Sequence, residues 1–346
     1  MHINQGPTEK NLIKLFGRRK KNTLREVAPQ LTSWQRRVLH QEGLPPAAFS
    51  YAAYDEMERD AMVQTCLTVK KLGVLAGTTK IVPADDSQEA RRKAWFVERA
   101  FERMEGSPHT VLIAAMDAFA KGWSVQEAVY RPEGGFLWLE AIRPKDPALF
   151  GLDVDRFGKV RGLTLALPGE TPVELPRGKF VVYANRGSYG RPKGRSDLDA
   201  AHRHWQSKAG LLAAWKFHLE RYAMPTVLGR YQRGLALEEQ GSFLSAMQNL
   251  SQHTAVVFPS EIEVDTLGGT KEASTGFMDA IDFHNREIAR AILGQTLTTD
   301  EGRRVGSLAM GKVHLQVLLL QLEAIRRELA DVVMTEQVIR PLIELN

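Results

Sequence analysis

Apolar residues recur at helical spacing in the first third of the chain. From Ala52 to about Leu75 the repeat predicts one helix, which Gly73 and Gly77 end. Its apolar positions are Met57, Ala61, Cys66, Val69 and Leu72. The segment TKIVPAD, residues 79–85, follows and favours a short strand.

Two further helices are predicted before residue 121. Ser87 has the side chain of an N-cap residue and precedes a run in which apolar positions repeat at helical spacing. Another helix is predicted from Ser107 to Ala120. The first 49 residues show no such repeat and contain the pair Pro45 and Pro46, so we expect them to form an arm or docking segment.

Residues 124–185 change to short β-rich segments separated by Gly, Pro and Asp. They are SVQEAVY, FLWLEAI, ALFGLDV, VRGLTLAL and KFVVYAN. Such segments favour strands joined by turns. We expect them to form an antiparallel sheet packed against the preceding helices, which makes the first half of the chain α+β.

Long helices dominate the second half. Ser196 is predicted to cap a helix of about 27 residues that Pro225 closes. A small α/β module follows, with strands in TVLGRYQ, TAVVF and EIEVDTL and a helix over residues 237–250. Two more helices are predicted, at residues 272–293 and 305–334, and a polar loop joins them. His284 falls on the apolar stripe of the first, where we expect it in a core or an interface.

Composition limits what these elements can be. The chain has 346 residues, 43% of them hydrophobic and 25% charged, which suits a globular protein with one large core or two smaller ones. Gln316, Gln321 and Glu323 interrupt the longest apolar stretch, so no membrane span is expected. The amino terminus lacks the apolar core of a secretory signal. Cys66 is the only cysteine, which excludes an intrachain disulfide, and its helical spacing predicts a core position.

The positive charge is concentrated at the amino terminus. The net charge is +5, but residues 1–40 carry nine basic and two acidic residues, or +7, which leaves −2 for the remainder. The basic run is Arg18, Arg19, Lys20 and Lys21. Two interpretations remain open for it: a solvated tail, or an arm that meets DNA or an acidic partner. The near-neutral body does not have the charge of a domain that grips DNA tightly.

No catalytic, cofactor or metal motif is found. The segment GSYGRPKGRS lacks the spacing of a phosphate-binding P-loop and is interpreted as a flexible connection. His202 and His204 lie two apart on a helix and therefore point to different faces. Because no nucleophile elbow, zinc-binding motif or dinucleotide fingerprint occurs either, we expect no enzyme, no cofactor and no metal.

Two segments carry a family resemblance. GRPKGRSDLDAAHRHWQSKAGLLAAWKFHLERYAMP, from Gly190, and AILGQTLTTDEGRRVGSLAMGKVH, from Ala291, resemble the portal proteins of Mu-like phages, and the similarity extends over most of residues 30–346. The resemblance implies an α+β portal fold with an α/β wing, long stem helices, a small α/β clip, a tunnel loop and a helical C-terminal part. The chain stops at Asn346, so a minimal or absent crown is expected.

The resemblance also assigns segments. They are a basic arm at 1–49, a wing at 50–193, a first stem helix at 194–225, a clip at 226–269, a second stem helix at 270–294, a tunnel loop at 295–306 and a C-terminal wing or crown-side helix at 307–346. In the tunnel loop the implied DNA-facing residues are Gln295, Thr296, Thr298, Thr299, Asp300, Glu301, Arg303 and Arg304. In the clip the implied motor-facing residues are Arg230, Tyr231, Gln232 and Arg233. Without the resemblance, residues 295–306 equally suit a plain polar connection between helices.

The function implied by the resemblance is a ring in one capsid vertex, through which double-stranded DNA is packaged and ejected. The implied partners are further copies of the chain in a dodecameric ring, non-specifically bound DNA, the terminase large subunit, major capsid and scaffold proteins, and a head–tail connector. The expected location is the virion, and the host cytoplasm during assembly, with no membrane contact. The alternative is a DNA-binding or nucleic-acid-processing protein that uses the basic arm; oligomer size separates the two.

Overall fold

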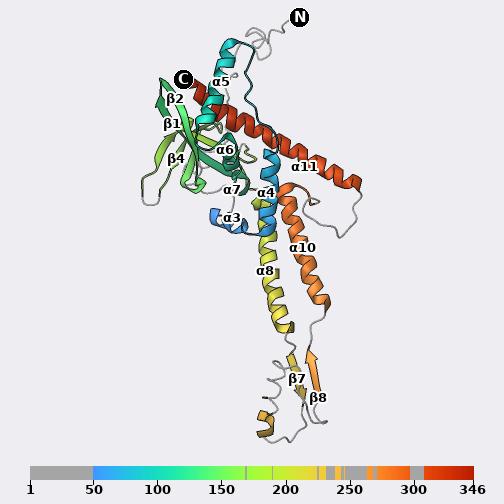
Figure 1. The fold of residues 1–346 in the computed structure, drawn as a ribbon. Helices are drawn as coiled ribbons and strands as arrows, with labels where there is room; N and C mark the ends of the chain where they lie inside the picture. Colours follow the sequence, from blue (N-terminus) through green and yellow to red (C-terminus); the bar gives the residue numbers. More distant parts are fainter. Residues whose placement is uncertain are drawn as a thin grey trace, which may run out of the picture. The chain divides into compact units, whose positions relative to one another are not determined.

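The computed structural model describes residues 50–167, 170–188, 190–223, 226–230, 238–242, 245, 263–267, 271–296 and 308–346 (Figure 1). They divide into two compact units. The first takes the described residues up to Asp199 and those from Leu308 onward, and the second takes those from Ala200 to Thr296. Helices and antiparallel strands are both present, which confirms the α+β class.

The first unit begins with two helices where the sequence predicted one. They are α3 (Tyr51–Met57) and α4 (Ala61–Leu75). The break falls at Asp60, whose carboxylate accepts hydrogen bonds from the backbone NH groups of Met62 and Val63 and so starts a new helix. Gly73 does not end α4 but lies inside it. Cys66 is fully buried there, as predicted.

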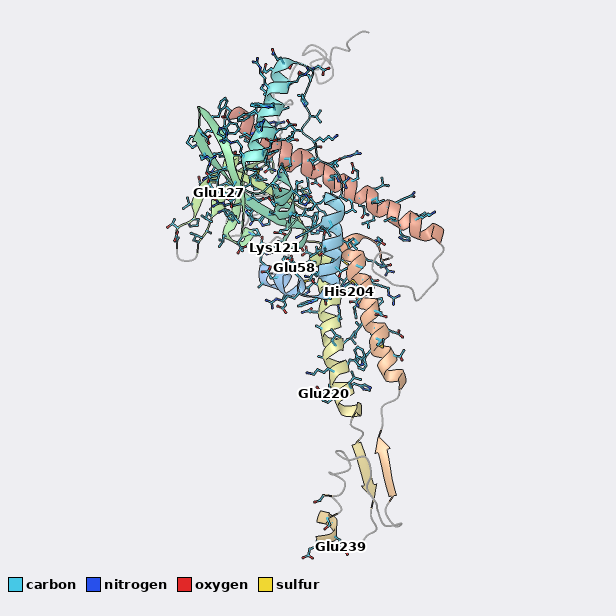
Figure 2. All side chains as sticks on the ribbon, viewed as in Figure 1. Glu58, Lys121, Glu127, His204, Glu220 and Glu239 are labelled. Atoms are coloured by element: carbon cyan, nitrogen blue, oxygen red, sulfur yellow. The ribbon has the colours of Figure 1, made fainter. Side chains whose placement is uncertain are left out.

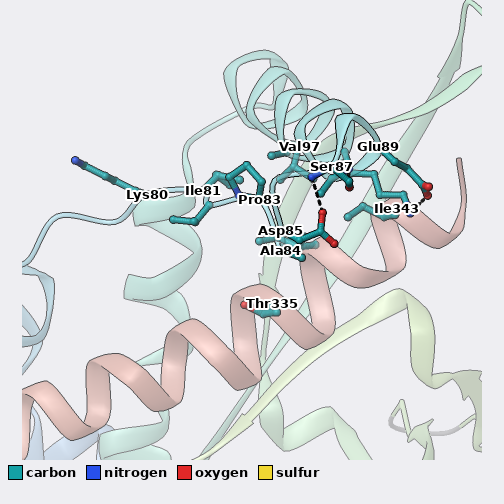
Figure 3. Close-up of a pocket in the computed structure, with 15 residues that line it drawn as sticks. Lys80, Ile81, Pro83, Ala84, Asp85, Ser87, Glu89, Val97, Thr335 and Ile343 are labelled. Atoms are coloured by element: carbon teal, nitrogen blue, oxygen red, sulfur yellow. Dashed lines mark hydrogen bonds and ion pairs between the residues drawn. The ribbon is translucent and has the colours of Figure 1, made fainter. Parts of the chain in front are cut away.

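Residues 79–85 do not form the strand predicted for TKIVPAD. They lie in irregular backbone before α5 (Gln88–Arg103), and no described strand pairs with them. Pro83 has no NH to give to a ladder, and Asp85 turns the chain by accepting a hydrogen bond from the NH of Ser87 at 2.8 Å (Figure 3). Ser87 then caps α5 as predicted, through a hydrogen bond from the NH of Ala90.

The helix predicted from Ser107 to Ala120 is also divided. α6 (Pro108–Ala115) starts with a reciprocal capping box between Ser107 and Thr110, and α7 (Ala118–Lys121) follows after a short break. Gly122 ends α7 with a φ of 85° and leads directly into the first strand.

Six strands form two three-stranded antiparallel sheets instead of the single sheet predicted. One sheet has the order β2–β1–β6, and the other has the order β3–β4–β5. The strands are β1 (Trp123–Glu133), β2 (Phe136–Lys145), β3 (Phe150–Val154), β4 (Val160–Leu165), β5 (Val173–Pro176) and β6 (Phe180–Ala184). The short helices η1 (Pro147–Leu149) and η2 (Arg177–Lys179) precede β3 and β6. The sequence did not reveal β5 because this strand is only four residues long and mostly exposed, with Leu175 alone partly buried.

A core joins the two sheets. It is made by buried residues of β1, β3, β4 and β6: Trp123, Val125, Phe150, Leu152, Val154, Leu163 and Phe180. The C-terminal helices pack on other parts of the unit: α11 (Leu308–Glu328) against α4, η3 (Leu329–Ile339) against β6, and α12 (Arg340–Glu344) against α5 and β2. Together they extend past the predicted end near Met334. The η3 segment is a π-helix, in which Thr335 donates its hydroxyl hydrogen to the carbonyl of Ala330, five residues earlier.

The second unit is built on two long helices and a strand pair. α8 (Leu198–Ala223) starts in the first unit and continues into the second; α10 (Lys271–Leu293) returns. Between them β7 (Thr226–Arg230) pairs antiparallel with β8 (Glu263–Leu267). Of the predicted helix at 237–250, the described residues 238–242 and 245 are helical, whereas the predicted strand TAVVF lies outside the described residues. No helix in the described part is both long and apolar enough to cross a bilayer.

Candidate functional site

The segment that carries the first half of the resemblance leads from β6 into α8, and a buried carboxylate holds it. Asp197 is 1% exposed, and its Oδ2 atom lies 2.5 Å from the Nζ atom of Lys70 on α4, which is 5% exposed. Its Oδ1 atom accepts a hydrogen bond from the side-chain amide of Asn185 at 3.0 Å and lies 3.3 Å from the guanidinium of Arg186. The charge of Asp197 is therefore balanced by residues from two other parts of the unit.

Lys70 depends on this carboxylate. Burial lowers the pKa of the Lys70 ammonium, and the negative charge of Asp197 opposes that shift. The ammonium also lies 4.4 Å from the ring centroid of Phe119 on α7, a cation–π contact. Removing one member of the pair would leave the other charged and buried, which costs far more than an exposed ion pair contributes.

The first turn of α8 is tied down by two more side chains. Ser196 lies one residue before the N-cap position predicted for it, because α8 begins at Leu198. Its hydroxyl accepts a hydrogen bond from the NH of Leu198 at 2.9 Å and donates to the carbonyl of Ala120. The hydroxyl of Tyr54 on α3 donates to the carboxylate of Asp199 at 2.6 Å. Burial raises the pKa of Tyr54, so this phenol stays protonated and remains a donor.

Gly194 allows the chain to pass between two backbone segments. Its φ is 73°, and a Cβ at this position would overlap the carbonyl oxygens of both Asn185 and Gly122. Both the conformation and the space therefore require glycine. This contradicts the prediction that GSYGRPKGRS is a flexible connection: its second half is packed tightly against β6 and the end of α7.

Lys193 is a buried lysine without a carboxylate partner among the described residues. It is 0% exposed, and its Nζ atom donates to the carbonyl of Phe150 at 3.1 Å and lies 4.8 Å from the ring centroid of Trp123. Burial lowers the pKa of Lys193 to about 7. The side chain thus joins β3 to β1, while Trp123 itself donates to the hydroxyl of Tyr51 at 2.6 Å.

Side chains from α11 and η3 complete backbone hydrogen bonding elsewhere in the unit. Arg326 donates to the carbonyls of Gly73 and Val74, at 3.1 and 2.8 Å, and so caps the C-terminal end of α4. The amide of Gln337 accepts from the NH of Val182 at 2.8 Å and donates to its carbonyl at 2.9 Å. The glutamine thereby acts as one residue of an additional strand at the β6 edge.

The two helices of the second unit meet through aromatic and histidine side chains. His204 of α8 and His284 of α10 have their Nδ1 atoms 3.1 Å apart, and His218 contacts Phe277 with ring centroids 5.6 Å apart and ring planes tilted by 48° (Figure 2 labels His204). His284 thus lies in an interface between helices, as predicted, but its partner is a second histidine that the sequence did not identify.

Large apolar side chains on the long helices remain exposed. On α8 and α10 they are Leu212, Phe217, Leu219, Met278 and Phe283, of which Phe217 is 64% exposed. On α11 they are Val313, Leu315, Val317, Leu319 and Leu320, of which Leu320 is 71% exposed. Single exposed leucines are common, but an aliphatic run of this length on one helix is typical of an interaction surface.

Most residues that the sequence assigned to DNA or a motor lie outside the described residues. Of the tunnel-loop set only Gln295 and Thr296 are described; Gln295 is buried and follows Gly294, whose φ is 74°. Of the clip set Arg230 ends β7. Outside the described residues lie Thr298, Thr299, Asp300, Glu301, Arg303, Arg304, Tyr231, Gln232, Arg233, Arg18, Arg19, Lys20 and Lys21.

The described residues hold no group of three or more histidine, cysteine, aspartate or glutamate side chains placed to bind a metal. A groove of about 540 Å³ lies between residues 80–85, α5 and the C-terminal helices (Figure 3). Its one hydroxyl close to a carboxylate is that of Ser87, which already caps α5. The groove offers no arrangement of nucleophile and base.

Two sheets, a long helix pair with a strand pair between its helices, and a long C-terminal helix are thus the elements of this chain. The family described as "Portal protein of Mu bacteriophage" matches residues 51–346, and the chain belongs to this family. The portal protein of Escherichia phage Mu is 26% identical over 328 residues, which cover 85% of this chain and 56% of that protein. The Mu-like prophage FluMu protein gp29 of Haemophilus influenzae is 24% identical over 313 residues, with the same coverage. The chain therefore spans about half the length of these curated relatives.

Solved structures share the fold at lower sequence identity. A chain from the virion of a native gene transfer agent particle has a TM-score of 0.62 at 13% identity, covering 90% of this chain and 87% of that one. A chain from the neck of a native gene transfer agent particle, computed with C12 symmetry, has a TM-score of 0.57 at 14% identity, covering 84% and 82%. At this level of identity, these likenesses show a shared fold alone.

Proposed function

We propose that copies of this chain form a closed ring at one capsid vertex, through which double-stranded DNA is packaged and later ejected. The observation that carries the proposal is the exposed aliphatic run on α11, residues 313–320, together with the exposed apolar side chains of α8 and α10. Burying one such side chain contributes of the order of 1 to 3 kcal/mol. In a ring each copy buries one of its surfaces against the next, and the contacts close on themselves.

Two comparisons support a ring over a dimer. The chain belongs to the portal family, and a chain of the same fold occurs in a particle neck computed with C12 symmetry. On this basis we assign residues 50–193 to the wing, 194–225 and 270–294 to the stem helices, 226–269 to the clip, 295–306 to the tunnel loop and 307–346 to the C-terminal helix. The first stem helix would then begin at the firmly held segment around Ser196 and Asp197.

The channel in this proposal touches DNA weakly. The residues after position 40 carry a net charge of −2, so the body does not attract phosphates strongly. Arg303 and Arg304 would contact the backbone without reading the sequence, while Asp300 and Glu301 would limit the grip. The clip would face the terminase large subunit, which would supply ATP hydrolysis, and capsid, scaffold and head–tail connector proteins would dock elsewhere on a ring that is itself not an enzyme.

Leu320→Asp tests the surface that carries the proposal. The substitution places a charge on an exposed position, so the protomer should unfold at the same temperature as the wild type while ring formation is lost. Leu345→Asp is the matched control, because Leu345 is also exposed, at 48%, but lies in the last turn of the chain. If the Leu320→Asp variant forms rings normally, α11 is not part of the interface between copies.

The double variant Arg303→Ala with Arg304→Ala tests the tunnel loop. We expect intact rings that package or retain less DNA, because the loop loses its phosphate contacts. Measuring packaged DNA in particles assembled with the variant decides this, and normal packaging would refute the assigned role.

A further inference from the structure

A pair of histidines joins the two long helices of the second unit. The Nδ1 atoms of His204 on α8 and His284 on α10 are 3.1 Å apart, which is hydrogen-bond distance, and the ring centroids are 5.4 Å apart. Both side chains are half-buried. A hydrogen bond between two ring nitrogens requires that one carries a proton and the other does not.

Neighbouring groups decide which nitrogen carries the proton. The guanidinium of Arg203 donates from its Nε atom to the Nε2 atom of His204 at 3.1 Å. Since that nitrogen accepts, the proton of neutral His204 is on Nδ1, from which it is donated to the Nδ1 atom of His284. Two consecutive hydrogen bonds thus link Arg203 to His204 and His204 to His284, and both imidazoles must be neutral for the two bonds to form together.

Protonating either imidazole breaks at least one of these two hydrogen bonds. A proton on Nδ1 of His284 removes the acceptor, and two imidazolium rings in contact repel each other. Arg203 adds a third positive charge on the same side. Glu287, on α10, is the acidic group that acts to raise the pKa of His204, and it already pairs with Arg290. Burial, Arg203 and His284 together outweigh it and lower the pKa of His204, in agreement with a neutral pair.

We propose that His204 and His284 are a pH-sensitive contact that holds α8 and α10 together when neutral and releases them when protonated. The direction follows from linkage. A histidine whose neutral form is favoured in the folded state contributes its stability above the pKa of the unfolded chain, about 6.5, and loses it as the pH falls below that value. The helix pair should therefore be firm at pH 7.5 and looser at pH 5.5. The contact lies within one chain, so it operates in a single subunit and in a ring alike.

Hydrogen–deuterium exchange of the purified full chain tests the proposal, with labelling times corrected for the intrinsic pH dependence of exchange. We expect amides of residues 204–218 and 277–290 to open up to about tenfold more often at pH 5.5 than at pH 7.5, because pH 5.5 lies about one unit below the unfolded pKa of histidine and one group that stays neutral in the fold then costs about a factor of ten. His284→Asn keeps an acceptor for His204 but cannot take a proton, so the pH response should become smaller, because burial and Arg203 still act on His204. The double variant His204→Asn with His284→Asn has no titrating group at this contact, so its pH response should disappear. His218→Asn changes a histidine of the same helix pair that faces Phe277, and should keep the wild-type response.

Three results would overturn the proposal: equal wild-type protection at the two pH values, a pH response of wild-type size in the His284→Asn variant, or a loss of protection when EDTA is added at pH 7.5, which would identify a metal site instead. Should the His284→Asn variant fail to fold, C2-proton exchange of each imidazole, followed by mass spectrometry in the wild type, gives the answer without a substitution. His204 and His284 then titrate as a coupled pair if the proposal holds, and independently if it does not.

Discussion

Breaking the ion pair between Lys70 and Asp197 is the sharpest test of how the start of α8 is held. The two groups are 127 residues apart in sequence and 2.5 Å apart in space, and both are almost fully buried. At that distance and an effective dielectric constant of about 20, their attraction is about 6 to 7 kcal/mol, most of which the cost of desolvating both ions offsets. Removing one charge alone leaves the other ion buried, with its desolvation cost but without the attraction that offset it.

Asp197→Asn should lower the free energy of unfolding by about 3 to 5 kcal/mol, because Lys70 stays charged with no carboxylate beside it. Lys70→Met should cost less, since Asn185 and Arg186 still contact Asp197. The double variant should be clearly more stable than the sum of the single changes predicts, with a coupling of about 2 kcal/mol or more.

Urea unfolding of the four proteins at pH 7.5 measures these quantities, and a thermal scan should show a loss of about 5 °C for Asp197→Asn. A cost below about 1 kcal/mol for Asp197→Asn would refute the reasoning, because it would mean that the pair is open to water. Additive effects in the double variant would equally contradict it.

Three other predictions concern the same unit. Gly194→Ala should destabilise the protein by more than about 3 kcal/mol in thermal unfolding, because the added Cβ would overlap two carbonyl oxygens. Gly178→Ala is the control: a Cβ there meets nothing within 4 Å, so stability should change by less than about 0.5 kcal/mol. Gln337→Ala should cost about 1 to 3 kcal/mol in urea unfolding by leaving the NH and carbonyl of Val182 unpaired; an unchanged midpoint would show that water replaces the amide. The lowered pKa of Lys193, about 7, means that its neutral form is favoured in the fold, so stability should rise from pH 7 to pH 10 by up to about 4 kcal/mol. Lys193→Met should flatten that rise, and an unchanged slope would exclude Lys193 as its source.

Local chemistry explains which elements the sequence predicted well. Ser87 caps the helix it was expected to cap, Ser196 binds the first NH of α8 from one residue before the N-cap position, and α10 begins and ends within about one residue of its predicted range. These features depend on residues within a few positions of each other. The predicted helix at residues 52–75 was divided in the structure because Asp60 offers a second capping carboxylate, a signal that was present in the sequence but weaker than the apolar repeat.

Long-range contacts explain what the sequence could not predict. TKIVPAD has strand-forming residues, but a strand also needs a partner, and none of the described strands pairs with it. The pairing of Lys70 with Asp197 and that of His204 with His284 join positions 127 and 80 residues apart, so no local spacing reveals them. Lys193 gave no signal at all, since lysines are seldom fully buried.

Native mass spectrometry of the purified protein, combined with negative-stain microscopy, tests the central claim most directly. The proposed function predicts a ring of about twelve copies with a central hole, formed at high concentration or in the presence of scaffold protein if not spontaneously. A compact monomer or dimer that forms no ring under any of these conditions would contradict it.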